Sequence, residues 1–377
     1  MAIIDFVTNP HSGGGPRNSY TLARLLNENG YESNLIFFNE LTSQKRSDLI
    51  IKQFNVKAKM PNNLLRTLNR ALYQSDDVTF LKLPSFYFQE YFTRAMTLKK
   101  HRDTDAFIST FWQTVTPTSR VSKAFNKQHF YFVQADETKF SNNKIYKRLA
   151  EKSYQLNIPR FTHSKWVKDF LDLNYGGDNT NIGMGIDHEA FKPRNLEKEE
   201  VVFTIARSGP NKGFDVFVKA MNVLILKYPN IKIKIAGEAR IVEEMKSSGA
   251  IKFPFHYLGW IRDDMVLSEF YEKSIFVNTG AFEALPMPPL EAMACGSAVV
   301  MTDMPGAKEY AINGQNCLLS DPRDHDSFAE NISELLDSNT LRLKISRNAE
   351  NTARGYTWEK TIRNFTQFLA EHGMVAL

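Results

Sequence analysis

Short apolar runs alternate with amphipathic stretches along the whole chain, a pattern typical of β-α-β units and a parallel sheet. The first series predicts strands at residues 2–9, 33–39, 105–111, 129–134 and 160–164. A second series predicts strands at residues 201–207, 231–237, 255–260, 274–280 and 297–303. We therefore expect an α/β protein with two doubly wound parallel sheets.

A polar stretch at residues 191–200 separates the two series and contains Pro193, so it is the predicted interdomain linker. The expected N-terminal domain is 1–192, and the expected C-terminal domain is 196–356. The last amphipathic stretch, 357–373, predicts a helix with one apolar face, which we expect to pack back on the N-terminal domain.

Composition supports a folded protein that remains in the cell. The 377 residues exceed what one core usually holds, and the 42% hydrophobic and 24% charged fractions are ordinary for a globular protein. Cys295 and Cys317 are too few for a disulfide framework or a structural zinc site. The sequence shows no export signal or membrane-spanning pattern, so we expect a cytoplasmic location.

Charge is unevenly distributed, since residues 1–194 carry a balance of +9 within a total of +5. Basic clusters such as Lys144, Lys147 and Arg148 fit either an ordinary solvated surface or an anionic partner. The aromatic residues from Phe86 to Phe92 precede the basic stretch Arg94–Arg102, and they predict either a packed helix or peripheral contact with the inner face of an anionic membrane. These clusters are scattered, so we expect no nucleic-acid binding.

Chemistry is expected in the loops that follow strands, where open parallel sheets bind ligands. Gly13, Gly14 and Gly15 lie between a strand and a helix, where backbone N–H groups favour an anion. The alternative is a flexible turn without a ligand. In the second half, Arg207 and Lys212 lie in one such loop, where two cations can neutralise a diphosphate; the alternative is a capping arginine and a solvated lysine.

Two glutamates lie eight positions apart after the strand at 274–280. Glu283 is expected in a loop and Glu291 at the beginning of a helix, so the two carboxylates can bind hydroxyl groups at opposite ends of one ligand. That arrangement suits a nucleotide sugar, in which a diphosphate separates two hydroxylated rings.

Four motifs in this order resemble those of the retaining family 4 glycosyltransferases of the GT-B fold. They are the glutamate pair, the loop Arg207 to Gly213, the run Gly185-Ile186-Asp187…Phe191-Lys192-Pro193 and the turn Gly306-Ala307-Lys308-Glu309. The resemblance implies two facing Rossmann-like domains with a cleft between them. It also implies transfer of a sugar from a UDP-, GDP- or dTDP-linked donor, with retention and with no metal or other cofactor.

The resemblance also implies roles for individual residues. Arg207 and Lys212 would hold the diphosphate, Glu291 the ribose and Glu283 the transferred sugar. The remaining donor contacts would come from Phe282, Leu285, Pro286, Met287 and, across the cleft, Gly13, Gly14 and Gly15. The expected catalytic set is Glu283, Arg207, Lys212 and Asp136.

The acceptor side departs from the family, many of whose members carry a histidine near the sugar. Asp136 and Glu137 are the candidates here for acceptor contact or proton acceptance; alternatively, they are surface carboxylates near Lys139. Trp112 and His163 are further candidates, although His163 also fits a packed or capping histidine. The run from Phe130 to Glu137 is similar to rhamnosyltransferases of bacterial surface polysaccharides.

These observations predict transfer to a glycan or lipid-linked acceptor in cell-surface polysaccharide or glycoconjugate synthesis. Two alternatives remain open: a non-catalytic GT-B partner subunit, and a GT-B phosphorylase or epimerase. The presence of both glutamates and both cations counts against the first. The lack of a lysine motif for pyridoxal phosphate counts against a phosphorylase.

Overall fold

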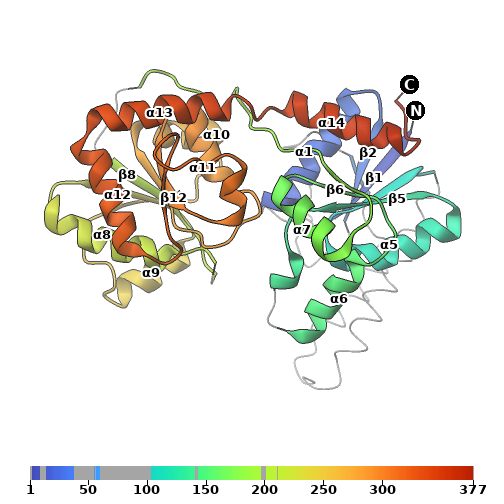
Figure 1. Ribbon diagram of the computed structural model, residues 1–377, viewed down its shortest axis with the longest axis horizontal. Helices are drawn as coiled ribbons and strands as arrows, with labels where there is room; N and C mark the ends of the chain where they lie inside the picture. Colours follow the sequence, from blue (N-terminus) through green and yellow to red (C-terminus); the bar gives the residue numbers. More distant parts are fainter. Residues whose placement is uncertain are drawn as a thin grey trace. The chain divides into compact units, whose positions relative to one another are not determined.

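The structure, a computed structural model, consists of two compact α/β units, each built on a parallel sheet (Figure 1). It describes residues 2–8, 14–37, 55, 57–59, 103–140, 143–196, 201–209 and 211–376. Contacts divide the chain into Met1–Gly183 with Thr361–Leu377, and Met184–Lys360. The sequence placed the divisions at 192–196 and 356–357, on the basis of a polar stretch rather than of contacts.

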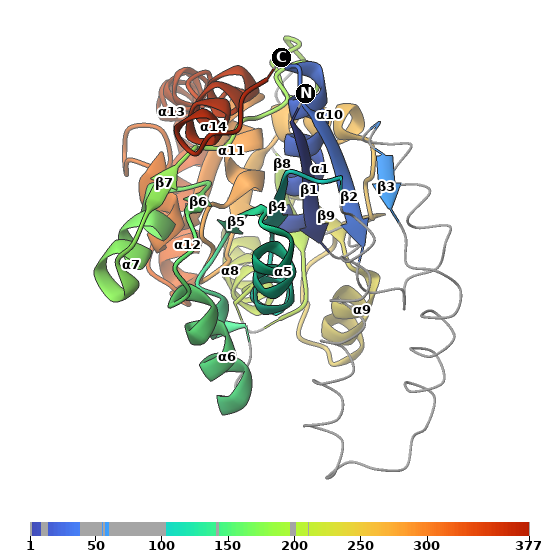
Figure 2. The same cartoon turned by 90° about the vertical axis from the view of Figure 1, so that its right-hand side faces the viewer.

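The first unit has seven strands in the order β3-β2-β1-β4-β5-β6-β7, and Figure 2 shows this row from β3 on the right to β7 on the left. Every pair in it is parallel. The strands are β1 (Ile3–Thr8), β2 (Glu32–Phe37), β3 (Lys57–Lys59), β4 (Ala106–Ser109), β5 (Gln128–Val133), β6 (Arg160–Thr162) and β7 (Asn179–Asn181). The helices are α1 (Gly14–Glu28), α5 (Trp112–Phe125), η1 (Glu137–Lys139), α6 (Lys144–Tyr154), α7 (Lys165–Tyr175) and α14 (Trp358–Glu371).

Helix α14 packs on the first sheet through aromatic side chains. The ring of Phe365 lies 4.7 Å from that of Phe161 in β6, and the ring of Phe368 lies 5.4 Å from that of Phe130 in β5. Both phenylalanines are fully buried, so the end of the chain completes the core of the first unit.

The second unit has six parallel strands in the order β10-β9-β8-β11-β12-β13. The strands are β8 (Val201–Ala206), β9 (Lys232–Gly237), β10 (His256–Gly259), β11 (Ile275–Asn278), β12 (Ala298–Thr302) and β13 (Leu318–Ser320). The helices are α8 (Phe214–Lys227), α9 (Ala239–Ser247), α10 (Asp264–Lys273), α11 (Met287–Ala294), η2 (Pro305–Glu309), α12 (His325–Asp337) and α13 (Asn339–Ala353).

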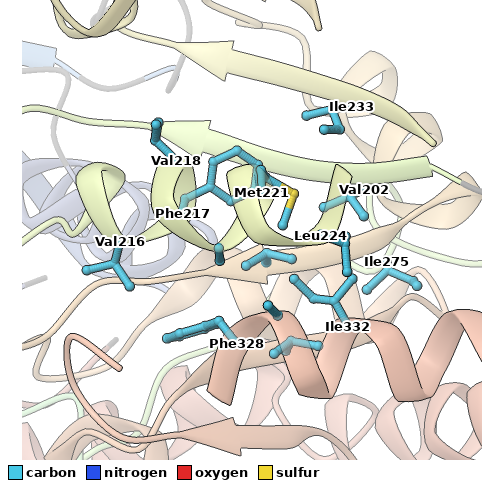
Figure 3. Close-up of a cluster of buried hydrophobic side chains, with 14 of the residues drawn as sticks. Val202, Val216, Phe217, Val218, Met221, Leu224, Ile233, Ile275, Phe328 and Ile332 are labelled. Atoms are coloured by element: carbon cyan, nitrogen blue, oxygen red, sulfur yellow. The ribbon is translucent and has the colours of Figure 1, made fainter. Parts of the chain in front are cut away.

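The core of the second unit lies between its sheet and the helices α8 and α12. Figure 3 shows Phe217 and Met221 of α8 beside Ile332 of α12 and Val202 of β8. Burial of such side chains contributes about 25 cal/mol per Å² of apolar surface, so this cluster anchors the strands whose ends carry the site. No helix in the described ranges has the length and apolar character needed to cross a bilayer.

Candidate functional site

A pocket lies at the carboxyl ends of β8 and β11, the neighbouring strands from which the order of the second sheet runs in opposite directions. Open α/β sheets bind ligands at such a switch point. Arg207 directly follows β8, and Gly280 follows β11. Both residues line the pocket together with Lys212 and Glu283, so the structure brings together three residues predicted from the sequence.

The two loops of this pocket are joined through Gly213, which adopts a left-handed backbone (φ 66°) before α8. A Cβ added there would lie 1.9 Å from Thr279 O, so only glycine fits. The Thr279 hydroxyl donates to Gly213 O at 2.7 Å, and Ala281 N–H donates to Asn211 O at 2.9 Å. These bonds fix the cationic loop relative to the glutamate loop.

The two cations of the pocket differ in their partners. Lys212 Nζ donates to Glu283 Oε1 at 2.7 Å, with the lysine side chain 32% exposed and the glutamate 15% exposed. The Arg207 guanidinium, half-buried, makes no hydrogen bond or ion pair with any other residue that the structure describes. A guanidinium in this state keeps its full donor capacity for an anion such as a diphosphate.

The segment between the two glutamates differs from its predicted form in one respect. Helix α11 begins at Met287, so Glu291 lies in its second turn and not at its beginning. Its Oε2 accepts a weak hydrogen bond from the buried Tyr271 hydroxyl at 3.5 Å. Leu285 and Pro286 are buried, whereas Phe282 and Met287 are half-buried.

The turn at η2 and the tyrosine after it donate hydrogen bonds to the backbone of this segment. Gly306 N–H donates to Glu283 O at 3.2 Å, and a Cβ on Gly306 would lie 2.3 Å from that oxygen. The buried Tyr310 hydroxyl donates to Pro286 O at 2.6 Å. The sequence singled out the turn but not Tyr310, whose hydrogen bond depends on packing between the two segments.

The glycine-rich loop of the first unit is more helical than expected. Helix α1 begins at Gly14, so Gly14 and Gly15 form its first turn, whereas the sequence predicted a loop there; Gly13 lies outside the described residues. A Cβ on Gly15 would lie 3.4 Å from Gln134 Oε1, which also accepts from Asn18 Nδ2 at 3.2 Å. An added Cβ would therefore be in ordinary contact with Gln134, and this contact does not require glycine.

Asp136 and Glu137 follow β5, and both are only 4% exposed, so their interpretation as surface carboxylates is wrong. Asp136 caps η1 by accepting from Thr138 N–H at 3.2 Å. Glu137 Oε2 accepts a hydrogen bond from the backbone N–H of Trp112 at 2.7 Å and another from the Tyr131 hydroxyl at 2.6 Å. Burial raises the pKa of Glu137 from 4.5 to about 8.

His163 and Trp112 are also buried, at the ends of β6 and β4. The His163 ring lies edge-on to Phe132 at 6.1 Å, and burial lowers its pKa to about 4. Ser164, not His163, caps α7. Within the described ranges, no three His, Cys, Asp or Glu side chains gather as ligands of a metal would.

Comparison with known proteins finds a family match within the second unit. Residues 186–352 match the family model of glycosyl transferases group 1. One relative, the N,N'-diacetylbacillosaminyl-diphospho-undecaprenol alpha-1,3-N-acetylgalactosaminyltransferase of Campylobacter jejuni, is 32% identical over 44% of this chain and 43% of its own. Another, the phosphatidyl-myo-inositol mannosyltransferase of Mycolicibacterium smegmatis, is 25% identical over 59% of each chain. The chain thus spans about half the length of the curated relatives it matches.

Solved structures extend the likeness of fold to both units. Sucrose-phosphate synthase from Thermosynechococcus elongatus superposes with a TM-score of 0.79 at 15% identity and covers 99% of each chain. Anabaena HepE, solved with UDP and glucose, also has a TM-score of 0.79 at 15% identity, over 98% of this chain and 100% of its own. These neighbours confirm the predicted GT-B fold class. The resemblance to group 1 glycosyltransferases is confirmed for the matched region.

Proposed function

We propose that this chain, whose residues 186–352 match the group 1 glycosyltransferases, transfers a sugar from a nucleotide diphosphate sugar to a glycan or lipid-linked acceptor. The observation that carries the proposal is the pocket at the switch point of the second sheet, where Lys212 pairs with Glu283 and Arg207 lines the same pocket. Two cations and one carboxylate match a diphosphate beside a hydroxylated ring.

The donor is proposed to be UDP-, GDP- or dTDP-linked. Anabaena HepE, which shares the fold, was solved with UDP and with UDP-glucose, and this supports a nucleotide sugar. The names of two relatives specify lipid-linked acceptors, diphospho-undecaprenol and phosphatidyl-myo-inositol. They support a lipid-linked acceptor. We propose in addition a role in cell-surface glycan synthesis and a place at the cytoplasmic face of the membrane.

In the proposed reaction the anomeric carbon exchanges its bond to the donor phosphate for a bond to the acceptor oxygen, with retention of configuration. Arg207 and Lys212 neutralise the charge that develops on the leaving diphosphate, a task that needs no metal in this scheme. Glu291 accepts hydrogen bonds from the ribose hydroxyls and Glu283 from the sugar hydroxyls. The leaving phosphate takes the acceptor proton, and Asp136 contacts the acceptor.

Slow transfer to water tests this reaction without knowledge of the acceptor. The protein is incubated with each nucleotide sugar and EDTA, and the released sugar is followed by proton NMR. The proposal predicts that one nucleotide sugar yields nucleoside diphosphate and a sugar whose first-formed anomer has the configuration of the donor. The inverted anomer would contradict retention, and release only after a metal is added would contradict metal independence.

A further inference from the structure

Helix α6 and Phe140, the residue that follows η1, form a surface that the proposed reaction does not use. We call it the α6 surface, and it consists of Phe140, Lys144, Ile145, Lys147, Arg148 and Lys152. Phe140 is 57% exposed and Ile145 is 47% exposed. All four cations are exposed, so the surface combines apolar and cationic side chains.

The cations of α6 differ from those of α7 in having no ion-pair partner within the described ranges. On α7, Lys165 pairs with Asp169 and Lys168 with Asp172, both at 2.5 Å. Helix α6 carries four cations and one carboxylate, Glu151, and none of the four forms an ion pair with a residue in the described ranges. Their positive charge is therefore uncompensated on this helix.

The geometry of α6 arranges this charge as a stripe. Lys144, Arg148 and Lys152 follow one another at four-residue spacing and so form one row along the helix. The opposite side of α6 packs against the rest of the first unit, since Ala150 and Tyr154 are buried. The stripe therefore lies on the outer side of the helix.

The exposed Phe140 belongs to a chain of aromatic contacts that reaches helix α6. Its ring stacks on Phe111 at 6.1 Å with an interplanar angle of 16°, and Phe111 packs on Trp112 at 5.7 Å. Trp112 in turn contacts Tyr146 of α6 at 5.9 Å. These ring contacts connect the exposed Phe140 to the helix that carries the cations.

We infer that the α6 surface binds the surface of an anionic lipid bilayer. Anionic headgroups meet the cationic stripe, while Phe140 and Ile145 enter the boundary between headgroups and acyl chains. An acidic polysaccharide would pair with the cations but leave Ile145 in water, so a bilayer fits the mixed surface better. The inference deepens the membrane contact within the proposed function and places it on residues other than Phe86–Arg102, which lie outside the described part of the chain.

Sedimentation of the full chain with vesicles tests the inference. Vesicles of phosphatidylglycerol and phosphatidylcholine should deplete the protein at low salt, whereas phosphatidylcholine alone should not. Lys144→Gln, Lys147→Gln and Arg148→Gln together should lower the partition coefficient about a hundredfold, since each cation near a membrane contributes about fivefold. Phe140→Ser with Ile145→Ser should lower binding that persists at high salt.

Matched changes on α13 provide the control, because Leu343, Lys344 and Arg347 are exposed there. Leu343→Ser, Lys344→Gln and Arg347→Gln should leave vesicle binding unchanged. Equal depletion by neutral vesicles, α6 variants that sediment like the unaltered chain, or binding only to an acidic polysaccharide would overturn the inference. Nucleoside diphosphate binding, measured on the same samples, reports on the fold and on the proposed function, so the two proposals can fail separately.

Discussion

Lys212 Nζ lies 2.7 Å from Glu283 Oε1, although the two residues are 71 positions apart and follow different strands of one sheet. The pair lies in the pocket at the switch point, where it holds the ammonium group in place. A diphosphate that binds Lys212 therefore competes with Glu283 or shares the lysine with it. The two residues are therefore energetically coupled. Separate roles, with Lys212 on the diphosphate and Glu283 on the sugar, would not predict this coupling.

Lys212→Ala should weaken donor binding by roughly ten- to a hundredfold, because a hydrogen bond to a charged group contributes roughly 1.5–3 kcal/mol. Calorimetric titration with the nucleotide sugar measures the loss. Lys219→Ala, an exposed lysine of α8, is the matched control and should bind like the unaltered chain. Unchanged affinity in Lys212→Ala would remove this lysine from the donor site.

Glu283→Gln should behave differently from the lysine variant, because it releases the ammonium from its ion pair. We expect free nucleoside diphosphate to bind at least as tightly as before, while sugar transfer falls by roughly tenfold or more. Comparing the affinity for nucleoside diphosphate with the turnover number separates the two effects. A parallel loss of nucleoside diphosphate affinity would show that Glu283 holds the nucleotide and not the sugar. The double variant measures the coupling directly.

Gly213→Ala should destabilise the second unit strongly, because its Cβ would meet Thr279 O at 1.9 Å in addition to the cost of a left-handed backbone. Gly249→Ala is the matched control, since Gly249 has a similar φ of 71° and nothing within 4 Å of an added Cβ. The control should lose roughly 1–2 kcal/mol in urea unfolding, and Gly213→Ala more than that. Equal losses would mean that the two loops can separate without cost.

Stability should depend on pH through Glu137, whose pKa burial raises from 4.5 to about 8. A raised folded-state pKa means that the contribution is complete below about pH 4.5 and is lost as pH rises through 8. Glu137→Gln should therefore flatten the fall in unfolding free energy between these values, measured by urea unfolding at several pH values. Glu359→Gln, exposed on α14, should keep the unaltered slope. A steep slope that persists in Glu137→Gln would assign the pH dependence to other groups.

Two buried histidines, His129 and His163, change the unfolding free energy with pH in the opposite direction and at lower pH. Burial lowers the pKa of His163 to about 4 and that of His129 to about 3, from a usual value of 6.5. A depressed folded-state pKa means that their contribution is complete above about pH 6.5 and is lost as pH falls. His163→Gln should therefore reduce the loss of unfolding free energy between pH 6.5 and 4 in the same urea experiment. An unchanged loss would contradict burial of the neutral ring.

Much of the fold follows from hydrophobic periodicity, because long apolar strands such as β5 and β8 are buried on both sides. Short elements escaped this reasoning: β7 and β13 have three residues each, too few to show a period. The sequence of helix α5 shows only a weak helical pattern, because Pro117 lies inside it among threonines and serines.

The candidate site was predictable where it depends on loops after strands, and not where it depends on packing. Strand order explains why Arg207 and Glu283 line the same pocket, since adjacent parallel strands end at one edge of a sheet. The burial of Asp136 and Glu137 could not be predicted, because it depends on Trp112, Tyr131 and Tyr154 from three separate elements.

The most direct test of the central claim is calorimetric titration of the unaltered chain with UDP, GDP, dTDP and ADP in the presence of EDTA. The account predicts that one of these diphosphates binds without metal and raises the unfolding temperature. It also predicts that Lys212→Ala weakens that binding while Lys219→Ala does not. Binding by none of the four, or binding that Lys212→Ala leaves unchanged, would contradict a diphosphate site between Arg207, Lys212 and Glu283.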